Sequence, residues 1–263
     1  SRYSRAIFEK GFTMFAPYLK RVALVTGLAM AALSAQATVS PANTFDTIYG
    51  ANFTNLSSTY STTFLGGTVA SFAAKNNGAN ARFSFKPGQD GFLGVGVSPS
   101  HGNGRTPGEI DIGETITGSF SRGVLVKNFS VGLLFNGSEY DDVREKAIVS
   151  VLYADHTTAN FSLIATGNTV ALWNGSSTQV TNLSPATVNK GGAWSVANPF
   201  GNKLVSQVTF GAAPGARVDG KGTNQSDYTL LSITAAVPEP ETYAMLLAGL
   251  LAIGAAARRK KSS

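Results

Sequence analysis

Residues 147–173 read AIVSVLYADHTTANFSLIATGNTVALW. Within this stretch apolar and polar residues alternate in three runs, at 147–153, 160–165 and 169–173. A period of two places successive side chains on opposite faces of a strand. Gly167-Asn168 lies between the last two runs at the distance of a hairpin turn. This stretch therefore predicts neighbouring antiparallel strands with one buried face and one solvated face.

The same pattern recurs on both sides of this stretch. Runs rich in Val, Ile, Thr, Phe and Tyr and bounded by turn residues lie at 44–53, 62–72, 81–86, 91–97, 123–129, 131–135, 204–210 and 228–234. No sustained helical period is visible between them, although 139–146 would suit one polar helical turn. The runs amount to about ten to twelve strands and predict an all-β fold, an antiparallel β-sandwich that is jelly-roll-like.

The C-terminal end has a different pattern. Val-Pro-Glu-Pro at 237–240 is followed by the uncharged run YAMLLAGLLAIGAAA at 243–257 and by Arg258, Arg259, Lys260 and Lys261. Prolines keep a chain extended and stop a strand from continuing. A helix over the apolar run would span about 22 Å, so it could cross a bilayer only with local thinning or snorkelling of its flanking cations. We expect a transmembrane helix there rather than a buried soluble helix, which would carry a polar face.

This three-part order resembles the PEP-CTERM sorting signal of Gram-negative bacteria, a tail that is also classed as an ice-binding protein C-terminal motif. The resemblance covers residues 238–263 and implies recognition by an exosortase, which cuts near Pro238, Glu239 and Pro240. It also implies transient anchoring in the inner membrane and an association with exopolysaccharide and biofilm. The regular Thr-x-Thr ladders of ice-binding solenoids are missing from the sequence, so we do not expect ice binding.

An export signal precedes the strand-rich region. Lys20-Arg21, the apolar run 22–33 and the A-x-A site formed by Ala35 and Ala37 predict a signal peptide at 14–37. Residues 1–13 would then be an upstream extension, and the β domain would extend over 38–237. The partners implied are the Sec translocon and signal peptidase. An uncleaved signal anchor is the alternative, but the apolar run is short for a membrane span.

The net charge of the chain, +6, arises at its two ends. Residues 38–237 contain 12 Lys+Arg and 12 Asp+Glu and are therefore neutral. A neutral domain lacks the basic surface that attracts phosphate backbones, so we expect no nucleic-acid partner. The chain has no cysteine, so an exported domain of this length must be held together by packing alone.

One acidic segment could bind a cation. Glu109, Asp111 and Glu114 follow the glycine-rich run Gly94-Val95-Gly96. A strand would place Glu109 and Asp111 on one face and the isoleucines at 110 and 112 on the other. Ca²⁺ takes six to eight oxygen ligands and is the one cofactor this segment would suit, with Glu139, Asp141 and Asp142 as further donors. The alternative is a solvated acidic edge that discourages aggregation. The spacing does not match an EF-hand.

The two tryptophans, Trp173 and Trp194, permit two interpretations. Exposed aromatic rings beside turns could stack on sugars in a glycan site. Alternatively, both indoles anchor the core, as large aromatic side chains usually do.

Catalytic motifs are missing from the sequence. It contains no G-x-S-x-G, no cysteine nucleophile and no H-E-x-x-H, and its two histidines are His101 and His156. Carboxylate pairs for glycan hydrolysis could be drawn from the acids, but almost any domain offers such pairs. We therefore expect an exported, non-catalytic cell-envelope or extracellular-matrix protein. The alternative is a Ca²⁺-dependent carbohydrate-binding module with exopolysaccharide as its ligand, and a glycan-active enzyme ranks behind both.

Overall fold

The computed structural model describes residues 45–64, 66–88, 91–98, 107–137, 143–175, 179–185, 192–217 and 226–236, together with 248–251 and 253. The predicted signal peptide, the cleavage-site residues Ala35 and Ala37, the Pro238-Glu239-Pro240 motif and the basic end at 258–261 lie outside these residues.

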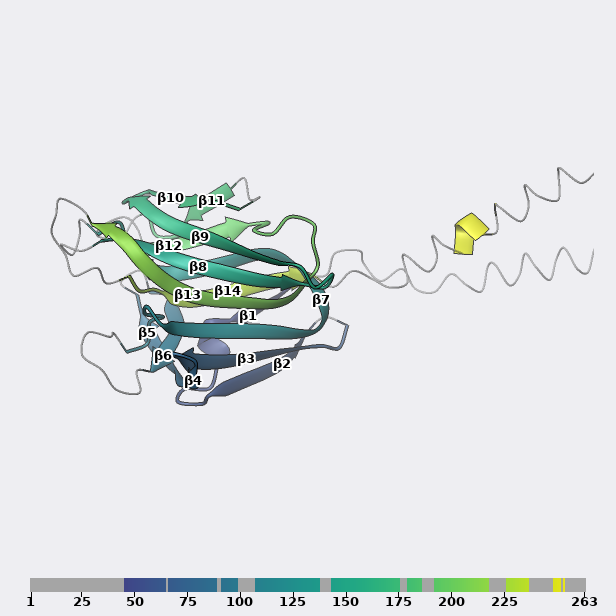
Figure 1. The fold of residues 1–263 in the computed structure, drawn as a ribbon, viewed down its shortest axis with the longest axis horizontal. Helices are drawn as coiled ribbons and strands as arrows, with labels where there is room; N and C mark the ends of the chain where they lie inside the picture. The colour runs from purple at the N-terminus through teal and green to yellow at the C-terminus, as the bar shows by residue number, and fades with distance from the viewer. Residues whose placement is uncertain are drawn as a thin grey trace, which may run out of the picture. The chain divides into compact units, whose positions relative to one another are not determined.

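The described part of the chain is all-β apart from short helical segments (Figure 1). Its strands are β1 (Phe45–Tyr49), β2 (Thr59–Phe64), β3 (Thr68–Asn76), β4 (Ala79–Asn80), β5 (Arg82–Pro87), β6 (Leu93–Ser98), β7 (Glu114–Leu134), β8 (Val143–Tyr153), β9 (Thr158–Gly167), β10 (Val170–Trp173), β11 (Gln179–Asn182), β12 (Gly192–Ala197), β13 (Val205–Arg217) and β14 (Thr229–Ala236). A 3₁₀ helix, η1 (Gly50–Asn52), follows β1.

The long strand β7 joins two layers of a sandwich-like fold. Its first half, up to Val124, pairs with β3 and β13, whereas its second half, from Leu125, pairs with β14 and β12. The β13 layer runs β2-β3-β7-β13-β8-β9-β10. The β14 layer runs β11-β12-β7-β14, with β1 and β6 both along the far edge of β14 and β5 beyond β6. All pairings between these strands are antiparallel, and jelly-roll connectivity stays a prediction.

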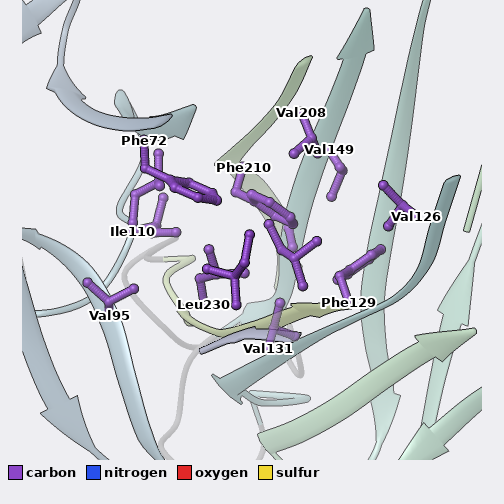
Figure 2. Close-up of a cluster of buried hydrophobic side chains, with 14 of the residues drawn as sticks. Phe72, Val95, Ile110, Val126, Phe129, Val131, Val149, Val208, Phe210 and Leu230 are labelled. Atoms are coloured by element: carbon purple, nitrogen blue, oxygen red, sulfur yellow. The ribbon is translucent and has the colours of Figure 1, made fainter. Parts of the chain in front are cut away.

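The core lies between the two layers (Figure 2). Phe129 of β7 and Phe210 of β13 are fully buried, and their ring centroids lie 5.6 Å apart at an interplanar angle of 68°. Edge-to-face packing of this kind adds to the gain from burying apolar area. A second aromatic group gathers around Phe53, whose ring stacks on Tyr60 at 4.5 Å and meets the edge of Phe83 at 4.9 Å. Packing of this extent accounts for a stable domain without disulfides.

Every alternating run overlaps a strand, and the differences in where strands begin and end have physical reasons. The run at 62–72 spans β2, a turn at Gly66-Gly67 with positive φ angles, and β3. The runs at 123–129 and 131–135 belong to one strand, β7, because it continues from one layer into the other. The polar helical turn expected at 139–146 is wrong for Val143–Lys146, which begin β8. The sequence did not reveal β12, because its alternation is limited to four residues, in which Trp194 and Val196 are buried and Ser195 and Ala197 are partly exposed.

The C-terminal helix receives no support as a membrane span. Residues 248–251 and 253 are helical, and their leucine and isoleucine side chains are exposed. Within the described ranges, no helix has the length and apolar character needed to cross a bilayer. The other residues of the predicted span at 243–257 lie outside those ranges.

Candidate functional site

The predicted acidic segment, residues 108–114, passes alongside β6 and the residues that lead into β14. The backbone N–H of Ile110 donates a hydrogen bond to the carbonyl of Tyr228 at 2.7 Å. Gly96 lies so close to this segment that a Cβ atom there would be 2.4 Å from backbone atoms of Glu109. The glycine run that the sequence suggested as part of a ligand loop therefore serves the close approach of two backbone segments.

All three predicted cation ligands are buried. The exposed fractions of Glu109, Asp111 and Glu114 are 4%, 4% and 1%. Lys86 Nζ donates to Glu109 Oε1 at 2.8 Å. Asn76 Nδ2 donates to Glu114 Oε1 at 3.0 Å, and the backbone N–H of Asp111 donates to Glu114 Oε2 at 3.2 Å. The expectation of a solvated acidic edge is therefore wrong, because these carboxylates bond to protein groups in the interior.

The segment is also not a strand with acids on one face and isoleucines on the other. Ile110 is fully buried, whereas Ile112 is 37% exposed. The backbone turns after Asp111, whose carbonyl accepts a hydrogen bond from the N–H of Glu114 at 2.9 Å. Gly113 has a φ of 90°, which favours glycine at this position. Local turn geometry therefore overrides the period of two.

Two further buried acids, Glu145 and Asp227, complete the carboxylate cluster. Glu145 accepts a hydrogen bond from the backbone N–H of Phe135, and its side chain is hydrogen-bonded to Asp227. Asp227 lies near Glu109, where it raises the pKa of that carboxyl. A signal for Glu145 existed: the alternation of β8 continues back to Val143, which places Glu145 on the inward face. No local pattern connects Asp227 with the other acids.

Burial dominates the electrostatics of the cluster. It raises the pKa of Glu109 from 4.5 to about 7, with a further rise from Asp227 and an opposing effect of Lys86. Burial likewise raises the pKa of Glu145 well above its usual value, and Asp227 adds to the rise. Burial therefore favours the protonated form of Glu145. The hydrogen bonds of the cluster join the acidic segment to β5 through Lys86 and join the start of β7 to β3 through Asn76.

The Ca²⁺ prediction finds no ligand set in the described residues. Among them, no three His, Asp or Glu side chains are arranged so that they could hold a metal ion. Glu139, Asp141 and Asp142, the further donors considered, lie outside the described ranges.

Both tryptophans contact the core. Trp194 is 1% exposed, and its Nε1 donates to the carbonyl of Leu134 at 2.8 Å, so its ring offers no face to a sugar. Trp173 is partly buried, and its ring stacks on Phe161 at 5.3 Å and meets Phe129 edge-on at 5.3 Å. These contacts fit the interpretation of both residues as core anchors.

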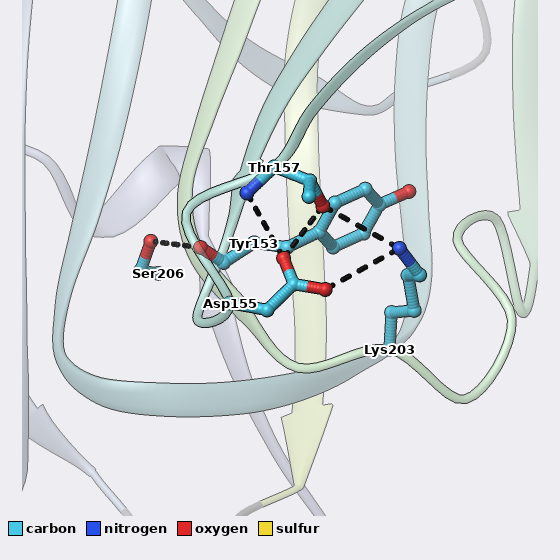
Figure 3. A network of polar contacts seen from close by, with 5 residues as sticks. All are labelled: Tyr153, Asp155, Thr157, Lys203 and Ser206. Atoms are coloured by element: carbon cyan, nitrogen blue, oxygen red, sulfur yellow. Dashed lines mark hydrogen bonds and ion pairs between the residues drawn. The ribbon is translucent and has the colours of Figure 1, made fainter.

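A second polar cluster stabilises the turn between β8 and β9 (Figure 3). Asp155 Oδ1 accepts hydrogen bonds from the backbone N–H and the hydroxyl of Thr157, at 3.0 and 2.5 Å. Lys203 Nζ lies 3.5 Å from Asp155 Oδ2 and 4.6 Å from the ring centroid of Tyr153. These bonds lower the pKa of Asp155. The bonds of Asp155 thus go to the turn itself, which is the pattern of a structural Asx turn.

Comparison with known proteins finds a match in the C-terminal part of the chain. The family model described as the PEP-CTERM protein-sorting motif matches residues 236–260. The tail is a PEP-CTERM sorting motif. No curated protein and no solved structure matches the chain significantly. The classification as an ice-binding tail stays a prediction.

The PEP-CTERM motif begins where the fold ends. Ala236, its first matched residue, is the last residue of β14 and pairs with both Phe45 of β1 and Leu125 of β7. The motif implies an exported protein that is anchored at the membrane for sorting and then processed by an exosortase.

Proposed function

We propose that this chain is a non-catalytic protein of the cell envelope or extracellular matrix, delivered by exosortase and associated with exopolysaccharide. The observation that carries the proposal is the PEP-CTERM motif joined directly to the last strand of a packed β domain. A sorting signal fused to one domain specifies delivery, and the domain is the cargo.

The hydrogen bonds that the buried carboxylates make within the protein support a non-catalytic role. Glu109, Glu114 and Glu145 each bond to a side chain or backbone group of the protein. An acid–base catalyst needs to reach the proton of a substrate. Carboxyls this deeply buried serve folding better than turnover.

The Ca²⁺-dependent carbohydrate-binding alternative rests on an exposed indole and a shell of oxygen ligands. Among the described residues, Trp194 is buried and no group of acids could hold a metal ion. Trp173 is partly buried, and Glu139, Asp141 and Asp142 lie outside the described ranges, so we place this alternative second.

Replacing Pro238, Glu239 and Pro240 by alanines tests the sorting proposal. We expect an unprocessed precursor retained in the membrane, because the exosortase no longer recognises the tail. Mass spectrometry of the C-terminus and fractionation of the cells measure this. An identical mature C-terminus in the wild-type protein and the variant would overturn the proposal.

A further inference from the structure

A row of hydroxyl side chains crosses the outer face of the β14 layer, exposed at its two ends, partly buried between them and only 7% exposed at Ser130 in its middle. Cross-strand partners share a face, and the register aligns one residue from each of five strands. In order across β1, β14, β7, β12 and β11 these residues are Tyr49, Ser232, Ser130, Ser195 and Thr181. Four strand spacings make the row about 19 Å long.

A second polar row runs beside the first, two residues along each strand. It consists of Thr47, Thr234, Asn128, Ala197 and Gln179. We call the two rows together the hydroxyl face.

Hydrogen bonds fix several side chains of the hydroxyl face. Thr47 and Thr234 share a hydrogen bond between their hydroxyls at 2.9 Å. Asn128 donates to the hydroxyl of Ser195 and accepts from Ser130 at 3.2 Å. Ser130 is buried and donates its hydroxyl proton to Asn128, so it orients its neighbours. The partly exposed Thr47, Thr234 and Ser195, in contrast, can bond a partner at little cost in side-chain entropy.

Two exposed aromatic rings border the hydroxyl face. Phe45 and Tyr49 lie on the same side of β1 as Thr47, and they are 51% and 54% exposed. Lys127 Nζ lies 5.8 Å from the centroid of the Phe45 ring, so one side of that ring already has a partner. Tyr49 is therefore the better platform for a ligand, since its hydroxyl also continues the row.

The chemistry of the hydroxyl face selects the partner. Its ten residues include no Asp, Glu, Lys or Arg. The charge of Lys127 lies at its border, beside Phe45, so a charged polymer would find its partner at the edge and not in the two rows. They include few apolar side chains, whereas the buried core of a protein–protein interface is apolar and aromatic. Hydroxyls and amides beside an aromatic ring match the hydroxyls and the apolar ring face of a sugar.

We infer that the hydroxyl face binds a neutral glycan chain, with a sugar ring lying on Tyr49 and its hydroxyls bonded to the two rows. The inference deepens the proposed function, on which it rests for the encounter with extracellular glycan.

The outer face of the β13 layer provides an internal control. It also carries paired hydroxyl and amide side chains: Ser61 with Ser71 at 2.9 Å, and Gln207 with Ser119 at 3.1 Å. The row that these four residues form includes no aromatic side chain. Ser71→Ala therefore removes an equivalent hydroxyl from a face that lacks the aromatic platform.

The test is retardation of the full chain in native gels containing hydroxyethylcellulose or galactomannan, both neutral, or alginate, which is anionic. The protein is kept in a detergent without a sugar headgroup. We expect at least one neutral polymer to retard the chain equally at low and high salt. Tyr49→Ala should weaken retardation about tenfold, Tyr49→Phe should retain most of it, and Ser71→Ala should change nothing.

Several results would overturn the inference. These are no retardation by either neutral polymer, retardation by alginate alone, equal weakening by Tyr49→Ala and Ser71→Ala, or self-association through Tyr49 without glycan. Thermal unfolding of each variant verifies its fold. Because sorting is measured separately through the mature C-terminus, failure of glycan binding and failure of the sorting proposal are distinguishable.

Discussion

At the scale of single residues, the least expected feature is a set of acids inside a neutral domain. Glu109 has a cation beside it, whereas Glu145 has a backbone N–H and another carboxyl. Burying a charge without a full partner is costly, so burial raises the pKa of both groups and favours their protonated forms.

The stability of the domain should fall as the pH rises. Folding raises the pKa of Glu109 and Glu145, so above about pH 4.5 the folded protein binds more protons than the unfolded chain. For Glu109 the loss would develop up to about pH 7 and amount to roughly 3 kcal/mol. Thermal unfolding at about pH 5 and about pH 8 measures it.

Glu145→Gln should reduce this pH dependence. The amide imitates the protonated carboxyl, because it can accept from the N–H of Phe135 and donate to Asp227. We expect the Tm of the variant to exceed that of the wild type at the higher pH and to approach it at the lower. Asp155→Asn, at the exposed turn, is the control and should leave the slope between these two pH values unchanged. Parallel slopes for Glu145→Gln and the wild type would contradict the assignment.

Among the strands, β6 depends on two glycines for its position, because its neighbours lie too close for larger side chains. A Cβ atom on Gly94 would lie 2.1 Å from the hydroxyl of Thr229, and one on Gly96 would meet the backbone of Glu109. Each glycine therefore permits the close approach of a neighbouring segment. In β6, glycines alternate with valines, and both are buried because neighbouring segments pack on both of its faces. The pattern of this strand alone does not show which segments these are.

Gly96→Ala should destabilise the domain by about 3 kcal/mol or more, because backbone atoms rather than a flexible side chain would have to move. Gly167→Ala is the matched control. Its nearest neighbour would be 4.0 Å away, so we expect a small effect. Chemical denaturation compares the two variants, and equal midpoints would contradict the close approach of β6 to the acidic segment.

At the scale of the whole molecule, the last strand completes the fold. β14 pairs with β7 on one side and with β1 and β6 on the other. The first and last described strands, β1 and β14, therefore lie side by side. The sheet is complete only when β14 has paired with its neighbours. The match to the sorting motif begins at Ala236, which is still paired with β1 and β7, so the β domain and the motif share this residue.

Truncation separates the strand from the signal. A chain that ends after Tyr228 lacks β14 and should show no cooperative unfolding, because β7, β1 and β6 lose their shared partner. A chain that ends after Pro240 keeps β14 and should unfold at the same Tm as the full protein. Circular dichroism during heating measures both. A cooperative transition in the shorter chain would show that β14 is dispensable.

Local sequence patterns are enough to predict the all-β class, most of the strand positions and the sorting motif. All of these depend on residues close together in the chain: a period of two, turn residues between runs, and the order of Pro-Glu-Pro, apolar run and cations. The sequence also identified Glu109, Asp111 and Glu114 as an unusual group, but it did not predict that they are buried.

The surroundings of these residues depend on contacts between segments that are far apart in the chain. Lys86 of β5, Glu145 of β8 and Asp227, which precedes β14, come from distant parts of the chain and join Glu109 through the packing of the two layers. The hydroxyl row from Tyr49 to Thr181 likewise exists only in the register of five strands. Pairing between distant segments depends on the whole core at once, and no local pattern encodes it.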